Sequence, residues 1–349
     1  MNGWLNRARS WAPPEAWTRV HSIDAHTEGE PLRVVFSGFE DLEGATVLER
    51  RRWARAQCDD VRRALMWEPR GHADMYGCIV MPAVTAEADL SVLFTHNEGF
   101  STMCGHGIIG VATVLVECGL VESSGDEVSI GIDTPAGFVR AHAQCAPDGR
   151  VHRVRFENVP SFAERLDATV EVAGVGTVRY DLAFGGAYYA YVEAADVGVG
   201  LVPGDVDRLI DMGQRIKHAV QEADPPSHPE DDDLSFVYGT IFIGPAHEEE
   251  HHSRNVCVFA NGEVDRCPTG TGVSGRLAIH HARDEVDIGE SIRIESILGT
   301  CFDGMVLRAT QAPETPTIVP EVAGRAWITG RHEFLLAPDD PLRTGFLVR

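Results

Sequence analysis

Two short glycine-rich segments hold the residues best suited to chemistry. The first reads CGHG (residues 104–107), the second reads TGTG (residues 269–272), and each is followed by a helical pattern. A helix that begins in such a turn leaves its first N–H groups unpaired, and its dipole adds partial positive charge there. Glycine also lets a ligand approach the backbone closely. Either segment alone is a weak signal, but the pair predicts two anion sites that hold one carboxylate between them.

Cys104 stands at the start of the first of these helices. The helix end and the nearby N–H groups stabilise a thiolate, so we expect a lowered pKa for this thiol and a role as a base. His106, two residues on, would orient a substrate or add positive charge. The structural alternatives are a small buried core cysteine and a histidine whose nitrogens are satisfied within the fold.

Both segments belong to a longer internal repeat whose copies lie about 165 residues apart. Each copy continues into a strand pattern and a second glycine turn, which ends at Gly137 in the first copy and at Gly299 in the second. A repeat of about one domain length indicates two domains of similar architecture. We place the boundary between them near Val159–Ala163.

Local patterns predict mixed α and β structure. Strands are expected at Arg33–Phe36, Val128–Ile132, Val151–Phe156, Phe236–Ile243 and Ile292–Ile294. Helices are expected at Glu49–Met66, Gly107–Glu117, Asp205–Glu222 and Gly272–Arg283. Prolines and an acidic run predict a solvated loop over Ala223–Leu234.

Composition narrows the class of protein. A length of 349 residues suits two domains, and 44% apolar residues supply a core for each. The net charge of −23 argues against nucleic acid or an anionic membrane as partner and favours a small-molecule substrate. The N-terminus lacks a secretory apolar region, and the longest apolar stretch is too short to span a bilayer. The eight cysteines are spread along the chain and include no C-x-x-C pair. We therefore expect a cytoplasmic protein with reduced thiols.

Six longer stretches resemble the proline racemase family. They are IDAHTEGEPLRVV (23–35), EPRGHADMYG (68–77), HNEGFSTMCGHG (96–107), FGGAYYAYV (184–192), VFANGEVDRCPTGTGVSG (258–275) and ITGRHEFLLAPDDPLRTGF (328–346). The resemblance begins at about Arg19 and covers nearly all of the chain from there on.

The resemblance implies a fold and a domain division. The fold is α/β (α+β) and diaminopimelate epimerase-like: two similar domains, each a sheet wrapped around a central helix, with the active site in the cleft between them. Applied here, residues 1–18 form an extension, 19–160 form the first domain, 161–324 form the second, and 325–349 return to the first. The family also implies no cofactor and no metal, and it suggests a homodimer, although no feature of this sequence indicates one.

The resemblance also assigns roles at the α-carbon of a proline-type amino acid. Cys104 removes the α-proton, Asp265 and His106 contact the ring nitrogen, and Phe259 lines the ring pocket. The substrate carboxylate is held by the backbone of Gly105, His106, Gly270 and Thr271. His72 and Asp74 are further candidates for contacts on the substrate side.

One departure from the family pattern bears on the reaction. Racemases have D-R-S-P-C-G-T-G where this chain reads D-R-C-P-T-G-T-G, so Thr269 replaces their second catalytic cysteine. A threonine hydroxyl has too high a pKa to act as a base or as a matched proton donor. The two-base exchange of racemisation should therefore be lost. A Cys/Thr pair resembles the family's dehydratases of trans-3-hydroxy-L-proline, and this implies a cofactor-independent hydro-lyase.

The stereochemistry of that substrate agrees with a single base. In trans-3-hydroxy-L-proline the α-hydrogen and the 3-hydroxyl lie on the same ring face. One thiol could therefore take the α-proton and pass it to the departing hydroxyl, so that Thr269 need only fill space or hydrogen-bond. The enamine formed first should tautomerise to Δ1-pyrroline-2-carboxylate.

Cys267 leaves an alternative open. It precedes Pro268, which favours extended backbone, and in extended backbone residues two apart point to the same side. Cys267 would then point into the cleft as Thr269 does and supply a second acid for a 4-hydroxyproline 2-epimerase or a proline racemase. The structural alternative is a serine-like hydrogen-bonding position. A non-catalytic amino-acid binding protein is disfavoured by the intact Cys104 turn.

A rival motif stands apart from these segments. His247–His251 matches H-E-x-x-H, which binds zinc when a helix puts both histidines on one face. Here the motif follows Gly244 and Pro245 and has no helical periodicity around it. We therefore expect a solvated loop rather than a metallopeptidase site.

Overall fold

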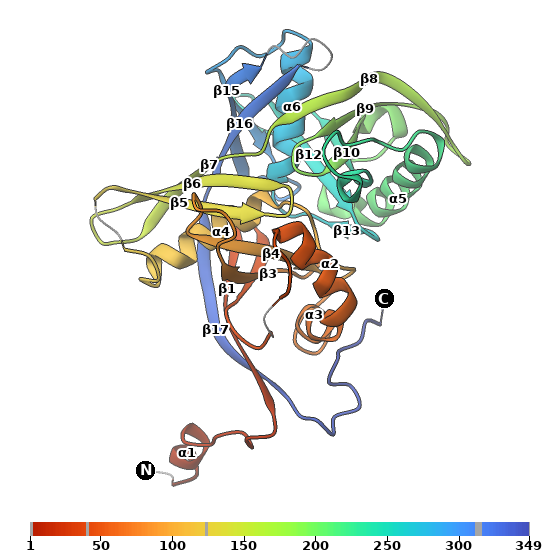
Figure 1. Ribbon diagram of the computed structural model, residues 1–349. Coiled ribbons are helices and arrows are strands. Elements are labelled where there is room, and N and C mark those ends of the chain that lie inside the picture. The colour runs from red at the N-terminus through yellow and green to blue at the C-terminus, as the bar shows by residue number, and fades with distance from the viewer. Residues whose placement is uncertain (1–2, 40–41, 123–124, 311–315, 349) are drawn as a thin grey trace.

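The computed structural model describes residues 3–39, 42–122, 125–310 and 316–348. Two series of strands, each with a helix inserted, make up most of it (Figure 1). The first series is β1 (Thr18–Thr27), β2 (Glu30–Val35), β3 (Tyr76–Pro82), β4 (Leu90–His96), α4 (Gly105–Glu117), β5 (Glu127–Thr134), β6 (Gly137–Cys145) and β7 (Val151–Glu157). The second is β9 (Gly176–Phe184), β10 (Tyr188–Glu193), β11 (Val237–Gly244), β12 (Ser253–Phe259), α6 (Gly270–Ala282), β14 (Ser291–Glu295), β15 (Cys301–Thr310) and β16 (Thr317–Gly324), with the short β13 (Glu263–Val264) before α6.

Strand pairing follows the same plan in both series. Antiparallel β1–β2, parallel β2–β3, antiparallel β3–β4 and parallel β4–β5 lead to the antiparallel strands β5, β6 and β7. Antiparallel β9–β10, parallel β10–β11, antiparallel β11–β12 and parallel β12–β14 lead likewise to β14, β15 and β16. The predicted fold class, with two similar halves, is confirmed.

Two further strands complete the sheets. The strand β17 (Ala326–Leu336) pairs antiparallel with β1, and β8 (Ser161–Val172) pairs antiparallel with β9. Antiparallel pairing of β16 with β7 joins the two halves. Because β8 starts at residue 161 and β16 ends at residue 324, we propose that the domains divide after residues 160 and 324.

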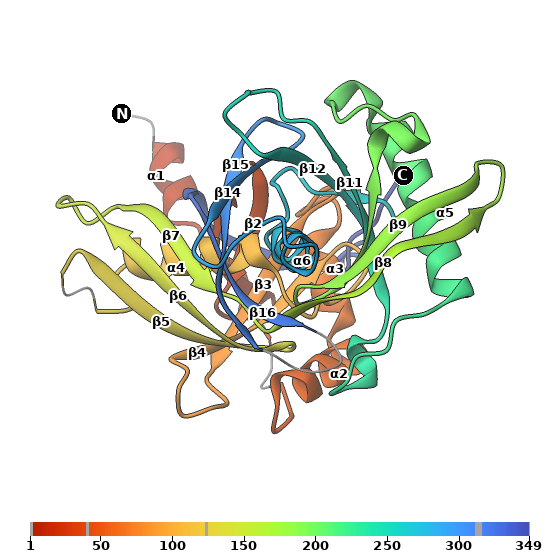
Figure 2. The same cartoon turned by 90° about the horizontal axis from the view of Figure 1, so that it is seen from above.

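Each half encloses one helix. Twelve of the 13 residues of α4 and ten of the 13 of α6 are buried, as expected of helices that are apolar or small on every side. Figure 2 shows α6 end-on, with strands around it. Both helices begin two residues earlier than the sequence pattern indicated, at Gly105 and Gly270. The glycine turns are therefore the first turns of the helices themselves.

The single helix expected over Glu49–Met66 is wrong. It is two helices, α2 (Val47–Gln57) and α3 (Asp59–Met66), because Cys58 leaves the helical region (φ −124°, ψ 15°). Acidic residues in the first turn of α3 favour a new helix start at that point. Buried Arg51 and Arg62 on the two helices donate to main-chain carbonyls of residues 96, 97 and 100. The pair thereby fixes the loop that leads to Cys104.

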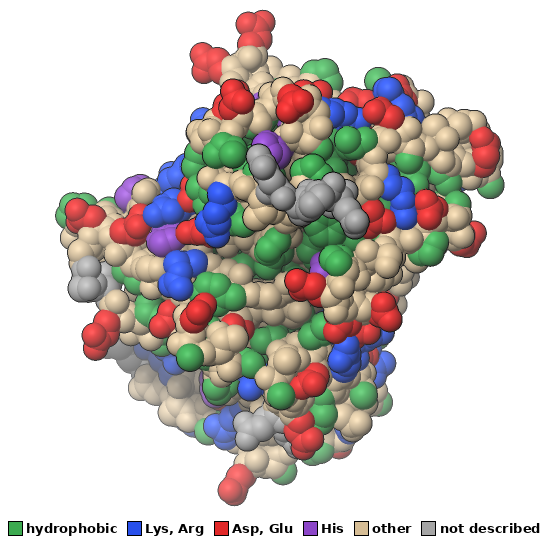
Figure 3. Space-filling model, turned by 45° about the horizontal axis from the view of Figure 1, so that its top comes forward, with side chains coloured by type: hydrophobic (Ala, Val, Ile, Leu, Met, Phe, Trp, Pro, Cys, Tyr) green, Lys and Arg blue, Asp and Glu red, His purple; other side chains and the backbone are tan. Residues whose placement is uncertain are grey.

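The remaining segments lie around this framework. The helix α5 (Val206–Ala223) matches its prediction, and the expected loop after it contains only the short η3 (Asp232–Leu234). The helix α1 (Gly3–Arg9) buries no residue and lies away from the body of the protein (Figure 1). Acidic side chains are spread over the face seen in Figure 3, interleaved with basic ones. Across the described ranges, no helix is long and apolar enough to cross a membrane.

Candidate active site

The two helix starts meet at the centre of the molecule. A Cβ atom added to Gly105 would lie 2.6 Å from the Cα of Gly270, and one added to Gly270 would lie 2.7 Å from the Cα of Gly105. Only glycine tolerates such an approach of backbone to backbone. The unpaired N–H groups at the two N-termini are thereby brought to one place, which fits a site for a single anion.

One small cavity opens beside this contact. Its volume is about 20 Å³, which is room for about one water molecule. It is lined by Tyr76, Met103, Cys104, Gly105, His106, Tyr189, Tyr238, Phe259, Asp265, Thr269, Gly270 and Thr271. The eight residues expected at the α-carbon, the carboxylate, the ring nitrogen and the ring are all among these twelve, namely Cys104, Gly105, His106, Phe259, Asp265, Thr269, Gly270 and Thr271. A five-membered ring does not fit a cavity of this size, so its walls must part to admit one.

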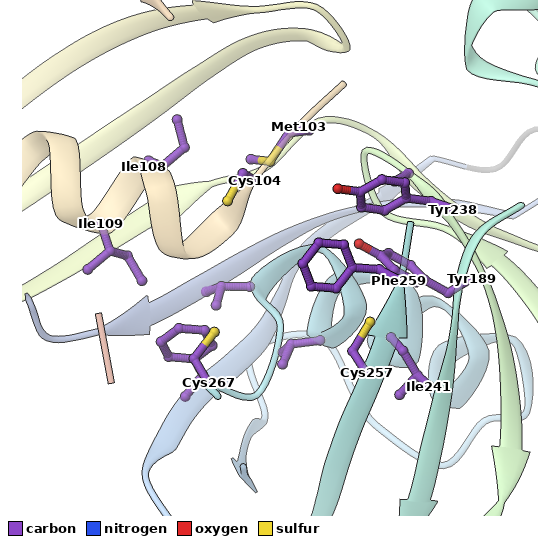
Figure 4. Packing of buried hydrophobic residues seen from close by; sticks show 14 of the residues in the cluster. Met103, Cys104, Ile108, Ile109, Tyr189, Tyr238, Ile241, Cys257, Phe259 and Cys267 are labelled. Carbon is purple, nitrogen blue, oxygen red and sulfur yellow. The ribbon is translucent and has the colours of Figure 1, made fainter. Parts of the chain in front are cut away.

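Cys104 caps α4 with its own sulfur. The Sγ accepts the N–H of Gly107 at 3.2 Å and lies 3.2 Å from Nδ1 of His106. The hydroxyl of Tyr76 also hydrogen-bonds this sulfur. Figure 4 shows Cys104 at the helix start, with Tyr238, Tyr189 and Phe259 on elements across from it. The sulfur therefore faces the cavity and has donors on its other sides.

The expectation of a lowered pKa for Cys104 is wrong in this closed cavity. Burial raises the pKa of the thiol well above its usual range, and the carboxylates of Asp265 and Glu30 raise it further. The N–H of Gly107 and the hydroxyl of Tyr76 act in the opposite direction. The donors at the helix start thus lower the pKa of the thiol, as the sequence argument expected, but the removal of the thiol from water raises it by more.

His106 and Asp265 stand next to the thiol. Burial lowers the pKa of His106 to about 4, so its imidazole is neutral near pH 7. Both oxygens of Asp265 accept hydrogen bonds from its own loop: Oδ1 from the N–H of Cys267 at 2.9 Å and Oδ2 from the Thr269 hydroxyl at 2.8 Å. A neutral imidazole and a carboxylate on one wall suit a bound ammonium group.

Thr269 has an unusual backbone conformation at the start of α6. Its φ is +65°, a region in which a β-branched residue is an outlier. Its side chain does not cap the helix and donates instead to Asp265. Strained residues of this kind cluster at functional sites. The Thr269 hydroxyl, which stands where racemases have a second cysteine, therefore donates its hydrogen bond to the carboxylate of Asp265.

Cys267 is not among the residues that line the cavity, which argues against the alternative in which it points as Thr269 does. The positive φ of Thr269 interrupts the extended backbone on which that alternation depended. The sulfur of Cys267 instead accepts the N–H of Thr269 at 3.4 Å. It lies near His106 and Asp265, behind the wall that those residues form.

The sequence argument named Phe259 for the ring pocket but missed three tyrosines that line the same cavity, Tyr76, Tyr189 and Tyr238. The rings of Tyr238 and Phe259 lie 5.4 Å apart, and those of Tyr76 and His106 lie 4.7 Å apart. Tyr189 donates to or accepts from the Thr271 hydroxyl at 2.9 Å. Tyr76 and Tyr189 fall in family-like stretches, but buried tyrosines in such stretches are equally typical of a hydrophobic core.

Other sequence candidates lie elsewhere. His72 is exposed, and neither it nor Asp74 is among the cavity-lining residues, whereas Tyr76 of the same stretch is. The H-E-x-x-H segment is a loop between β11 and β12, as expected. His247 contacts Arg254, and His251 contacts Glu295 at 2.8 Å, so their side chains take part in a structural network.

Comparison with known proteins places the chain among its relatives. The family model for proline racemase matches residues 22–347. The chain belongs to the proline racemase family. Among members of the proline racemase family, the trans-3-hydroxy-L-proline dehydratase of Colwellia psychrerythraea is 43% identical over 97% of this chain and 96% of its own length. The 3-hydroxyproline 2-epimerase of Burkholderia multivorans is 44% identical over 95% of this chain and 98% of its own length.

A solved structure of the proline racemase family supports the fold. A hydroxyproline epimerase from Agrobacterium vitis, crystallised with bound trans-4-OH-L-proline, superposes with a TM-score of 0.89 at 32% identity. The match covers 95% of this chain and 96% of that one. The chain is therefore an enzyme of the proline racemase family, with a thiol, two facing helix starts and a carboxylate and an imidazole around one cavity.

Proposed function

We propose that this enzyme dehydrates trans-3-hydroxy-L-proline to Δ1-pyrroline-2-carboxylate. The observation that carries the proposal is the hydrogen bond from the Thr269 hydroxyl to Asp265 at the position where racemases have a second cysteine. The site then has one acid–base thiol, Cys104, on one side of the cavity. Relatives named trans-3-hydroxy-L-proline dehydratase support the same choice.

The two helix starts would bind the substrate carboxylate. The backbone N–H groups proposed for this are those of Gly105, His106, Gly270 and Thr271. Asp265 and His106 would hold the ring nitrogen, and Phe259 would pack against the ring. Charge that develops on the carboxylate as the α-proton leaves would be stabilised by the same N–H groups, in the manner of an oxyanion hole.

Proton transfer would run through Cys104. Its thiolate takes the α-proton, which breaks the Cα–H bond and leaves an enolate-like intermediate. The resulting thiol then gives this proton to the 3-hydroxyl on the same ring face as the C3–O bond breaks, and water leaves. The enamine product tautomerises to the cyclic imine. The donors around Cys104, Gly107 and Tyr76, would stabilise the thiolate in competition with burial.

A second candidate is epimerisation at the α-carbon, favoured by the relative named 3-hydroxyproline 2-epimerase. Epimerisation needs a proton donor on the opposite ring face. The position that supplies it in racemases is Thr269, whose proton is directed to Asp265. Cys267, the other possible donor, does not line the cavity. These contacts favour dehydration over epimerisation of 3-hydroxyproline, 4-hydroxyproline or proline.

Proton NMR in D₂O with purified enzyme tests the choice. Trans-3-hydroxy-L-proline, trans-4-hydroxy-L-proline and L-proline are supplied separately without any added cofactor. We expect only the 3-hydroxy compound to be consumed, with a pyrroline product. Formation of an epimer from any of the three would show a second acid and contradict the one-thiol mechanism. The variant Cys267→Ser would then tell whether Cys267 is that acid.

The family resemblance further implies a homodimer in the cytoplasm, which we include in the proposal. Light scattering after size exclusion should then give twice the chain mass of 38.0 kDa. A species at the chain mass would exclude the dimer without affecting the proposed reaction.

A further inference from the structure

Behind the cavity wall, three side chains of different chemistry converge. Atoms of His106, Asp265 and Cys267 that can bind a metal lie within 4.8 Å of one another. They offer one imidazole nitrogen, one carboxylate oxygen and one sulfur, and all three residues are buried. Across the part of the chain that the structure describes, this is the one such group of three.

The imidazole of His106 is prepared to act as a ligand. Its ring is hydrogen-bonded to the backbone of Pro31. A metal-binding histidine characteristically donates its other N–H to a backbone carbonyl or carboxylate, which fixes the ring and its tautomer. The bond to Pro31 fixes the ring in this way, and the ring also contacts the Cys104 sulfur, which lies 3.2 Å from Nδ1 and 3.7 Å from Nε2.

Glu30 adds a buried carboxyl oxygen without a hydrogen-bond partner in the neighbourhood of the cluster. Glu30 is fully buried, and although its Oε2 accepts the N–H of Arg266 at 2.7 Å, its Oε1 has no hydrogen-bond partner. The Glu30 carboxylate interacts with both Asp265 and Cys267. The basic side chain next to Glu30 is Arg266, whose Nε lies 3.3 Å from Oε2 of Glu30.

We propose that His106, Asp265 and Cys267 form a binding site for Zn²⁺, next to the unpaired oxygen of Glu30. Mixed nitrogen, sulfur and carboxylate ligands suit zinc, at roughly 2.0–2.3 Å from the ion, so the three side chains must close in from their present separations of up to 4.8 Å. Binding converts the Cys267 thiol to a zinc-bound thiolate, and its proton leaves to solvent. Alkaline-earth ions prefer all-oxygen sites and should not bind here.

Such an ion would inhibit the enzyme. It would engage His106 and Asp265, the residues proposed above for the ring nitrogen of the substrate, so zinc and substrate should exclude each other. This consequence rests on the proposed function, whereas zinc binding itself does not. The site would therefore make the enzyme sensitive to free zinc without giving zinc any part in the reaction.

Equilibrium dialysis of the metal-free full-length chain against Zn²⁺ tests binding directly. We expect about one tight zinc per chain, weakened about 10-fold or more in Cys267→Ser, since loss of even a supporting contact costs about 10–100-fold in affinity. Cys118→Ser is the matched control, because Cys118 is an exposed free thiol away from the cluster, and it should bind as the wild type does. Equal binding by all three proteins, or no tight binding by the wild type, would overturn the site.

A second measurement does not depend on the folding of Cys267→Ser. Co²⁺ added to Cys104→Ser, which keeps all three proposed ligands, should give a thiolate-to-cobalt charge-transfer band. Addition of trans-3-hydroxy-L-proline should remove the band by displacement. No band would refute ligation by Cys267. A band that persists at saturating substrate would leave the metal site in place and contradict only the proposed substrate position.

Discussion

The starts of α4 and α6 occupy equivalent places in the two halves but differ in their first side chain. At α4, Cys104 is extended (φ −150°) and its sulfur caps the helix through the N–H of Gly107. At α6, Thr269 has φ +65°, makes no side-chain cap and hydrogen-bonds Asp265. The repeated backbone therefore supplies two similar helix starts for the proposed anion site, whereas the capping residue differs between a thiol and a hydroxyl.

The asymmetry has a structural cost on the α6 side only. A β-branched residue at positive φ costs of order 1–3 kcal/mol, which the surrounding loop must offset. The loop does so through Asp265, whose carboxylate receives both the Thr269 hydroxyl and the N–H of Cys267. The same carboxylate is a proposed contact of the substrate nitrogen. Asp265 thus offsets the strain at Thr269, holds the loop together and is also a proposed contact of the substrate.

Removal of the α4 thiol should have the largest effect. Cys104→Ser replaces the proposed base by a hydroxyl, and loss of a general acid–base group lowers the rate by about 10²–10⁴-fold. We expect kcat for 3-hydroxyproline to fall at the upper end of that range, because the same group acts twice. Steady-state kinetics measure it, with unchanged far-UV circular dichroism as the control for folding. Activity within tenfold of the wild type would show that another residue is the base.

The contact between the two helix starts should be next in importance. In Gly270→Ala the new Cβ would lie 2.7 Å from the Cα of Gly105, so the two starts must separate. Because a misplacement of about 1 Å can cost about 100-fold, we expect kcat/KM to fall by roughly that factor. Gly204→Ala is the control, since nothing lies within 4 Å of a Cβ at Gly204. Equal kinetics of the two variants would argue against the proposed anion site.

Tyr76 should affect the reaction through the thiol. Burial raises the pKa of Cys104, and the Tyr76 hydroxyl opposes this, so the thiolate fraction and the rate should rise with pH. Tyr76→Phe removes a hydrogen bond to a charged group, worth about 1.5–3 kcal/mol, and should lower the rate near pH 7 by about 10–100-fold.

The pH profile separates this role from simple packing. The rise in kcat/KM with pH should move to higher pH in Tyr76→Phe, by about one unit for each 1.36 kcal/mol lost. Tyr180→Phe, in a buried tyrosine outside the cavity lining, should leave the profile unchanged. A Tyr76→Phe enzyme that is slower at every pH with an unshifted profile would make Tyr76 a packing residue.

Sequence patterns predicted the repeat, the fold class and a set of residues that the structure gathers around one cavity. They did so because glycine turns, helix starts and family-like stretches are local features. The pKa of Cys104 was predicted in the wrong direction, since it depends on burial by Tyr76, Tyr238 and other residues distant in sequence. The sequence also left the direction of Cys267 open, because it could not show that one left-handed residue, Thr269, ends the extended backbone.

Restoring the symmetry of the two starts should give the smallest change in dehydration and a new reaction. Thr269→Cys places a thiol opposite Cys104 and loses the hydroxyl bond to Asp265, a neutral donor worth about 0.5–1.5 kcal/mol, so dehydration should fall by only a few-fold. The new thiol can return a proton to the opposite face, so recovered substrate in D₂O should carry deuterium at the α-carbon and include the epimer. Thr269→Ser, which keeps the hydroxyl, should show neither. Thr269→Cys could still dehydrate the substrate without exchanging the α-proton. In that case the helix starts of the two halves would differ in function because of where the side chain at residue 269 is held, by its φ of +65°, and not because of its chemical type.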